Sequence, residues 1–129
     1  MSVPSNYKFA KTDEWVKVDG KIATIGISDY AQEQLSDIVY LEIEVDVDDT
    51  VEKDAQFATV ESVKSASDIN SPVSGKVVEV NSSLSDNPEL LNSSPYDKAW
   101  LIKVELSNPA EVDGMMDAAA YEKHCAERS

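Results

Sequence analysis

The side chains that could form a catalytic site are scarce in this sequence. His124 and Cys125 are its one histidine and its one cysteine. Neighbouring residues point in different directions from a helix, so this pair cannot form the hydrogen-bonded base and nucleophile of a cysteine enzyme. A single cysteine and a single histidine also provide neither an internal disulfide nor a zinc-binding cluster. We therefore expect no cysteine enzyme, no zinc enzyme and no disulfide scaffold.

The carboxylates and glycines could form a carboxylate-pair catalytic site or a nucleotide-binding site. The chain has 25 Asp and Glu residues, but nothing in the pattern marks two of them for the opposed pKa values of a general acid and base. Its four glycines, Gly20, Gly26, Gly75 and Gly114, form neither a Gly-x-Gly-x-x-Gly motif nor a Walker motif. We expect no carboxylate-pair hydrolase and no nucleotide-binding site, and therefore no enzyme.

Lys64 is the residue whose position suggests chemistry. It lies in a short polar junction between a strand that ends near Glu61 and another that begins near Ser67. A tight turn there would hold the amine away from the sheet, and the four-carbon stem would extend the reach of any group attached to it. That geometry suits post-translational modification, although for the single residue taken alone a solvated lysine in a hairpin is clearly the better explanation.

The charge balance restricts the possible partners. The 129 residues include 11 Lys and Arg against 25 Asp and Glu, a formal net charge of −14. This excess repels phosphate backbones and anionic membrane surfaces, and it can steer encounter with a basic protein surface. No apolar run approaches the ~20 residues that cross a membrane, and the first residues do not resemble a signal or transit peptide. We expect protein partners, no nucleic acid and no membrane.

The elements that must position Lys64 are short strands separated by turns. Residues 15–18 and 21–27 predict a hairpin around the positive-φ pair Asp19-Gly20, and Ser28 can cap a helix that runs to about Ser36. Residues 39–47 alternate between an apolar face that includes Val39 and an acidic face. Further strands are predicted at Ala55–Glu61, Ser67–Ser71, Lys76–Asn81 and Ala99–Leu106.

Turn and helix signals complete the predicted architecture. Pro72 to Gly75 suggests a hairpin with a positive φ at Gly75, Pro88 can begin a short helix, and Asp117 can cap a last helix over residues 118–123. We expect a mainly β flattened barrel or sandwich with short edge helices and a C-terminal helix. It would form one domain over residues 1–129, with its core at about 7–106 and a C-terminal helical segment at about 109–126.

The longer stretch around Lys64 favours the hypothesis that this lysine is modified. It reads Glu61-Ser-Val-Lys-Ser-Ala-Ser-Asp-Ile-Asn-Ser-Pro-Val-Ser-Gly-Lys-Val-Val-Glu-Val-Asn81 and closely resembles the lipoyl-attachment region of the glycine cleavage system H protein family. Other segments resemble the same family in the same order, from about Tyr7 to Tyr121. They are Trp15-Val-Lys-Val-Asp-Gly20, Ala23-Thr-Ile-Gly-Ile27, Asp37-Ile-Val-Tyr40, Leu84, Pro88-Glu-Leu-Leu-Asn-Ser-Ser-Pro-Tyr96, Trp100 and Met116-Asp-Ala118.

Three positions depart from the family pattern. Asp13 stands where the family commonly has a histidine before Glu-Trp, so any role of that imidazole is absent here. The stretch 45–54 lacks the usual proline and glycines, which leaves its turn type open. Ala99 replaces a frequent glycine before the tryptophan and can alter the bend into the last strand. None of these departures involves Lys64.

The resemblance implies a non-catalytic carrier with a lipoyl-domain-like barrel-sandwich hybrid fold. Lys64 matches the lysine that a lipoyl ligase or transferase converts to N6-lipoyllysine. The family passes the aminomethyl group of glycine from a pyridoxal-phosphate glycine decarboxylase (P protein) to a tetrahydrofolate-dependent aminomethyltransferase (T protein). A flavin-dependent dihydrolipoyl dehydrogenase (L protein) then reoxidises the carrier. Such proteins work in the bacterial cytoplasm, our first expectation for this chain, or in the mitochondrial matrix.

The resemblance also implies roles for four polar residues. Thr12 and Glu14 match family positions before the first tryptophan, and Asp68 matches the acid after the lysine. We expect them to dock the loaded arm, since a carboxylate can accept a charge-assisted hydrogen bond from its cationic amine. For Glu14 and Asp68, a charged residue at a strand edge is an equally good explanation. Glu61 is expected to be recognised by the modifying enzyme, or else to solvate the strand end.

Other carriers and one non-carrier stay open as alternatives. Biotinyl domains usually show Ala-Met-Lys-Met, whereas residues 62–65 contain no methionine. Lipoyl domains of 2-oxo acid dehydrogenase acyltransferases often have Asp before the lysine and lack the Trp15 region. An H-like protein that relays lipoate to other complexes would have the same sequence features, and an acidic interaction domain would need no modification.

Overall fold

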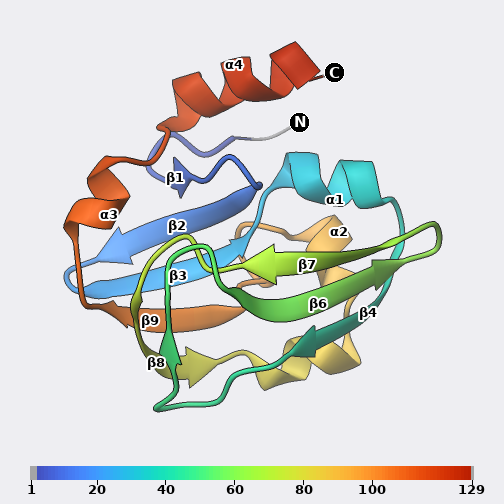
Figure 1. Cartoon of the computed structure of the whole chain (residues 1–129). Helices are drawn as coiled ribbons and strands as arrows, with labels where there is room; N and C mark the ends of the chain where they lie inside the picture. The colour runs from blue at the N-terminus through green and yellow to red at the C-terminus, as the bar shows by residue number, and fades with distance from the viewer. Residues whose placement is uncertain (1–2, 129) are drawn as a thin grey trace.

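Antiparallel strands form two sheets in the computed structural model, which describes residues 3–128 (Figure 1). Residues 1, 2 and 129 of the predicted domain lie outside the described residues. A six-stranded sheet has the order β1-β2-β3-β9-β8-β5, and a three-stranded sheet has the order β4-β6-β7. The strands are β1 Lys8–Phe9, β2 Glu14–Asp19, β3 Ile22–Ile27, β4 Ile38–Ile43, β5 Thr50–Val51, β6 Gln56–Ser62, β7 Ala66–Asn70, β8 Gly75–Val80 and β9 Ile102–Leu106.

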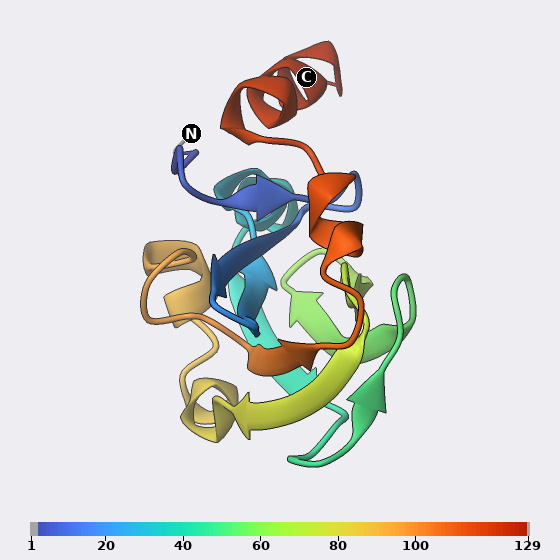
Figure 2. The ribbon, with the colours of Figure 1, turned by 90° about the vertical axis from the view of Figure 1, so that its left-hand side faces the viewer.

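Short helices lie at the edges of the two sheets. They are α1 Asp29–Leu35, the 3₁₀ helix η1 Ser82–Asp86, α2 Leu90–Ser93, α3 Ala110–Asp113 and α4 Ala118–Arg128. Figures 1 and 2 both show α4 next to β1, at one end of the molecule. Within residues 3–128, no helix has the length and apolar character needed to cross a membrane.

Side chains from both sheets form one buried cluster, as expected when two sheets pack face to face. The six-stranded sheet contributes Val16, Ala23, Ile25, Val51, Val77, Ile102 and Val104, and the three-stranded sheet contributes Leu41, Phe57, Ala58, Val60 and Ile69. A second buried cluster of Phe9, Trp15, Tyr30, Tyr121 and Cys125 attaches α4 to β1 and α1. The prediction of a mainly β fold with short helices and a C-terminal helix is confirmed.

The hairpin predicted at residues 15–27 is present as β2 and β3, but its turn differs by one residue. Asp19 pairs with Ile22, so Gly20 and Lys21 form the two-residue loop. Gly20 has a φ of 64°, and Asp19 ends the strand with no positive φ. A glycine in the first loop position is the arrangement of type II′ turns rather than of the Asp-Gly type.

The apolar face predicted for residues 39–47 is wrong at its first and last positions. A register shift between Ile38 and Tyr40 marks a β-bulge, and an extra residue reverses which side chains face the core. Ile38 and Leu41 are therefore buried, whereas Val39 is 57% exposed. The strand ends at Ile43, so Val47, which is 51% exposed, lies outside it.

The hairpin predicted at Pro72 to Gly75 is also wrong. This segment connects β7 of the three-stranded sheet to β8 of the six-stranded sheet, so it crosses between layers. Gly75 has no positive φ. A Cβ at Gly75 would stand 2.1 Å from the carbonyl oxygen of Glu105 on β9. The glycine is needed because two backbones approach closely, which the sequence pattern does not distinguish from a turn.

The predicted helix caps agree with the structure. The Ser28 hydroxyl accepts a hydrogen bond from the Ala31 amide at 3.1 Å. The Asp117 carboxylate accepts one from the Ala120 amide at 2.9 Å, and α4 continues past the predicted end to Arg128. The helix predicted to begin at Pro88 begins at Leu90, with the Pro88 carbonyl accepting from Leu91 at 3.1 Å.

Candidate functional site

Lys64 lies at the tip of the β6–β7 hairpin. Strand β6 ends at Ser62 and β7 begins at Ala66. The Ser62 amide donates to the Ser65 carbonyl at 2.8 Å, and the Ser62 hydroxyl accepts from the Ser65 amide at 3.2 Å. One serine thus closes the turn through both its backbone and its side chain. The turn places Lys64 in a defined position at the end of two paired strands.

The surroundings of Lys64 leave its amine accessible. The side chain is exposed, and Figure 1 shows the β6–β7 turn projecting beyond the neighbouring elements. The amide of Val63 donates to the Asp37 carbonyl at 3.0 Å, which ties the turn to the segment before β4. Among residues 3–128, no carboxylate forms an ion pair with Lys64. Acylation of this amine would break no salt bridge of the described chain.

A cleft of about 190 Å³ lies between the β1–β2 turn, α1 and β7. We call it the α1–β7 cleft. Thr12, Glu14 and Asp68 all line it, although Asp68 comes 54 positions after Glu14 in the sequence (68 − 14 = 54). The structure therefore brings together the three residues that the sequence predicts for arm docking. The remaining lining residues are Asp13, Ile27, Ala31, Gln34, Leu35, Val60, Ser67 and Ile69.

Glu14 is the buried polar group of the α1–β7 cleft. It is 3% exposed. The Thr12 hydroxyl donates to Oε1 of Glu14, and the Asn70 amide makes a long 3.5 Å contact with Oε2. Burial raises the pKa of Glu14 to about 7, because the hydrogen bonds that favour the carboxylate do not outweigh desolvation. A cationic ligand in the cleft would favour the charged form of this group.

Asp68 and Thr12 are exposed, so they lie nearer the solvent than Glu14. Asp68 is on β7, paired with Thr59 of β6. Four residues of extended chain span at most about 14 Å, which limits the separation of the Lys64 and Asp68 Cα atoms. A long side chain attached to Lys64 has only to follow β7 to reach the cleft.

Glu61 lies apart from these residues. It pairs with Tyr40 of β4 and Ala66 of β7. Successive side chains of a strand point to opposite faces, and the adjacent Val60 faces the cleft. Glu61 is therefore exposed on the outer face of the three-stranded sheet, near the Lys64 turn, and it does not line the cleft.

Sequence reasoning did not identify the contribution of α1 or of Asp13. Ala31, Gln34 and Leu35 form one wall, yet a short helix gives no signal of what its faces contact. Asp13 closes the β1–β2 turn with a φ of 78°, and its amide donates to the Ala10 carbonyl at 3.0 Å. Aspartate tolerates this left-handed conformation better than most residues, so an Asp directly before a strand was an available signal.

Comparison with known proteins gives a consistent result. The family model described as glycine cleavage H-protein matches residues 7–128. The chain is 54% identical over 125 residues to glycine cleavage system H protein 2, mitochondrial, of Arabidopsis thaliana, a match covering 97% of this chain and 80% of the relative. It is 50% identical over 127 residues to the glycine cleavage system H protein of Staphylococcus haemolyticus, covering 98% and 100% of the two chains.

A solved structure agrees with these relatives. The crystal structure of a glycine cleavage system H protein from Mycobacterium marinum superposes with a TM-score of 0.84 at 27% identity, and the match covers 98% of each chain. Similarity thus extends over nearly the whole chain. This chain belongs to the glycine cleavage H-protein family, the non-catalytic carriers of the glycine cleavage system, which bear lipoyllysine as their cofactor.

Proposed function

We propose that Lys64 is the residue of this chain that carries the lipoyl group, linked to its amine as N6-lipoyllysine. The observation that supports this most directly is the position of Lys64 at the tip of a turn closed by Ser62, with an exposed amine and no ion pair in the described range. A rigid turn presents the amine to a modifying enzyme, and the stem provides reach afterwards. The attached dithiolane supplies the sulfur chemistry that the side chains of this protein lack.

The second part of the proposal is that Thr12, Glu14 and Asp68 dock the arm when it carries the aminomethyl group. The buried Glu14 carboxylate can accept a hydrogen bond from the cationic amine, and Asp68 adds a second negative charge. A charge-assisted hydrogen bond contributes about 1.5–3 kcal/mol, enough to favour the docked arm without making it permanent. Apolar lining such as Ile27 and Val60 excludes water from the labile group.

The third part concerns the partners. Membership of the family implies exchange with the glycine decarboxylase, the aminomethyltransferase and the dihydrolipoyl dehydrogenase, and we propose that this chain serves all three. Its formal charge of −14 favours partners with basic surfaces around their active sites. The relatives are bacterial and mitochondrial proteins. We accordingly propose the bacterial cytoplasm, or the mitochondrial matrix, as its place of action.

Intact mass of the protein from its native host tests the attachment site. The wild-type chain and Lys76→Arg should carry one lipoyl-sized increment, and Lys64→Arg should carry none. Lys76 is the matched control because it is a β8 lysine paired with Asp48 at 3.2 Å. An increment of unchanged size on Lys64→Arg would contradict the proposal, and a biotin-sized increment on the wild type would indicate a biotinyl carrier.

Exchange of bicarbonate into glycine by the decarboxylase then tests the carrier function. Lys64→Arg should abolish the exchange that the lipoylated wild type supports. Full lipoylation without any exchange would favour a protein that relays lipoate to other complexes. In the same preparations, Glu61→Ala should slow lipoylation, whereas Glu79→Ala, an exposed change on β8, should not. Equal rates for the two variants would remove the recognition role of Glu61.

A further inference from the structure

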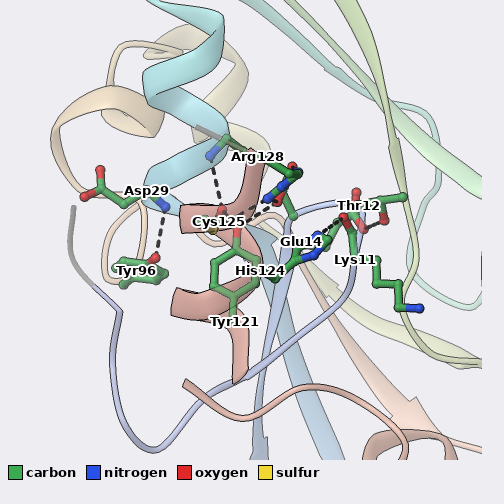
Figure 3. Close-up of polar contacts among 12 residues, drawn as sticks. Lys11, Thr12, Glu14, Asp29, Tyr96, Tyr121, His124, Cys125 and Arg128 are labelled. Carbon is green, nitrogen blue, oxygen red and sulfur yellow. Dashed lines mark hydrogen bonds and ion pairs between the residues drawn. The ribbon is translucent and has the colours of Figure 1, made fainter. Parts of the chain in front are cut away.

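The C-terminal helix is joined to the β1–β2 turn through the carboxylate of Asp13. Figure 3 shows Tyr121 and Arg128 of this helix beside the segment that carries Thr12 and Glu14. The Arg128 guanidinium donates to both oxygens of Asp13, at 2.6 Å to Oδ1 and 3.1 Å to Oδ2. The Tyr121 hydroxyl donates to Oδ1 at 2.8 Å. Two side chains of α4 therefore hold the same carboxylate, which sits between Thr12 and Glu14 in the sequence.

The hydrogen bonds continue from Tyr121 into α1. The hydroxyls of Ser28 and Tyr121 lie 2.5 Å apart. Because Tyr121 gives its single proton to Asp13, the Ser28 hydroxyl donates to Tyr121, and its oxygen accepts from the Ala31 amide at 3.1 Å. The Ser28 amide also donates to the Asp13 carbonyl at 2.8 Å. We call Asp13, Ser28, Tyr121 and Arg128 the α4 clasp.

Tyr121 and Arg128 of the α4 clasp make further contacts that hold their side chains in place. Tyr121 is fully buried, with its ring stacked on Phe9 at 4.4 Å and 5°. Arg128 lies over the Tyr30 ring at 4.3 Å. The hydrogen bond to Asp13 raises the pKa of Arg128, and burial raises the pKa of Tyr121. At neutral pH both groups therefore keep the protons that they donate to Asp13.

The α4 clasp connects two walls of the α1–β7 cleft. Of its four residues, Asp13 lines the cleft and the other three do not. One wall is the turn with Thr12 and Glu14, and the other is α1 with Ala31, Gln34 and Leu35. Asp13 holds a left-handed φ of 78°, a conformation that costs free energy for a residue other than glycine. Hydrogen bonds from α4 to the Asp13 carboxylate and from the Ser28 amide to its carbonyl offset that cost.

We propose that Tyr121 and Arg128 are positioning residues of the α1–β7 cleft, acting through Asp13 to hold the Thr12–Glu14 turn and α1 at the separation that admits the loaded arm. The inference rests on the proposed docking function of the cleft. It assigns a role to α4, which has no side chain in the cleft, and a partner to Asp13, which replaces a common histidine of the family.

The lifetime of the loaded arm tests the inference in the full-length lipoylated chain. Arg128→Ala and Tyr121→Phe should shorten the half-life of the aminomethyl-loaded form about two- to fivefold, the effect expected from loss of a partly exposed ion pair in the first variant and of one hydrogen bond in the second. The rate of loading by the decarboxylase should not change, because the Lys64 turn is untouched. Lys123→Ala is the matched control, since it removes a positive charge from an exposed position of the same helix and should keep the wild-type half-life.

A conservative variant separates positioning from simple destabilisation. Asn tolerates a positive φ and keeps one oxygen acceptor, so Asp13→Asn should retain more of the half-life than Asp13→Ala. A core variant such as Leu106→Ala, with a similar loss of thermal stability, should leave the half-life unchanged. Wild-type half-lives in both Arg128→Ala and Tyr121→Phe would overturn the inference.

A measurement on the unmodified chain distinguishes failure of the clasp from failure of the docking proposal. The charged residues that line the cleft with Glu14 are Asp13 on its own turn and Asp68 on β7, whereas α1 contributes the uncharged Gln34. Tyr121→Phe changes none of these charges. If the clasp positions the turn, carboxyl NMR should show the pKa of Glu14 falling from about 7 in this variant as water reaches it. An unchanged pKa of Glu14 in Tyr121→Phe would refute the role of the clasp, whatever the behaviour of the arm. An unchanged half-life of the loaded arm in Glu14→Ala would refute the docking proposal instead.

Discussion

Trp15 and Gly26 lie opposite each other on β2 and β3, and the indole ring occupies the space above the glycine. A Cβ at Gly26 would stand 2.6 Å from Cε2 and Cζ2 of Trp15. The ring cannot easily move away, because Trp15 is 1% exposed and its Nε1 donates to the Pro95 carbonyl at 2.9 Å. The start of β2, which carries Glu14, depends on this close packing.

Gly26→Ala should destabilise the protein by about 1–3 kcal/mol, because an added methyl group forces the indole or the strand to shift. Thermal denaturation of the unmodified chain measures the effect. Gly114→Ala is the control, since a methyl group there would have the Glu111 carbonyl oxygen as its nearest neighbour, at 3.9 Å. Equal melting temperatures for Gly26→Ala and the wild type would show that Trp15 can adapt.

Glu14 should make folding stability depend on pH in a defined direction. Its folded pKa of about 7 is above the ordinary value of 4.5, so the folded state binds a proton that the unfolded state has released. Stability therefore falls as pH rises from about 4.5 to 7, and it changes little beyond. As the pH rises from about 4.5 to about 8, the free energy of unfolding of Glu14→Gln should increase by ~1–3 kcal/mol relative to that of the wild type. Urea denaturation at the two pH values measures the difference, and parallel behaviour would contradict the raised pKa.

Removal of the Glu14 carboxylate should leave attachment of the lipoyl arm unchanged but shorten the lifetime of the aminomethyl group that the arm carries. Glu14→Ala should be lipoylated like the wild type, because Lys64 lies at the far end of β7 from the Asn70 contact. The loaded form should lose its aminomethyl group roughly tenfold faster or more, the effect of about 1.4 kcal/mol of lost docking free energy. Ammonia release from isolated loaded protein gives the half-life. Glu122→Ala, an exposed change on α4, should behave as the wild type.

The acidic surface should act on the encounter with partners. With a formal charge of −14, loading by the decarboxylase should slow as salt rises, because exposed charges beyond ~8 Å are screened at physiological ionic strength. The change should appear in the association rate, with the rate at saturating carrier unaffected. Stopped-flow loading at several salt concentrations separates the two. A salt-independent association rate would limit the role of the charge to solubility.

Local features of the fold were predictable from the sequence. The β2–β3 hairpin and the caps at Ser28 and Asp117 depend on neighbouring residues, and the structure contains all three. Two of the errors occurred where a distant strand decides the outcome. The bulge at Ile38 reverses the exposure of Val39, and Gly75 is set by the backbone of Glu105 rather than by a turn.

The candidate site also has a part that contiguous sequence predicts and a part that depends on packing. Lys64 could be predicted from the sequence as the attachment site, because the polar junction between two strands and the residues around it are contiguous. Thr12, Glu14 and Asp68 were named from family resemblance, and their gathering at one cleft required the packing of β7 beside the β1–β2 turn. The raised pKa of Glu14 likewise depends on burial by residues far away in the chain.

The sequence by itself determined the class of protein, its acidic surface and much of its strand pattern, and it singled out Lys64 as the proposed attachment site, because each of these is carried by residue type or by contiguous order. The tertiary structure alone decided that α1 forms a cleft wall and that α4 holds Asp13 through Tyr121 and Arg128. The contacts of Asp13 with α4 join residues 108 and 115 positions apart, and such contacts follow from the packing of the whole chain rather than from any local pattern.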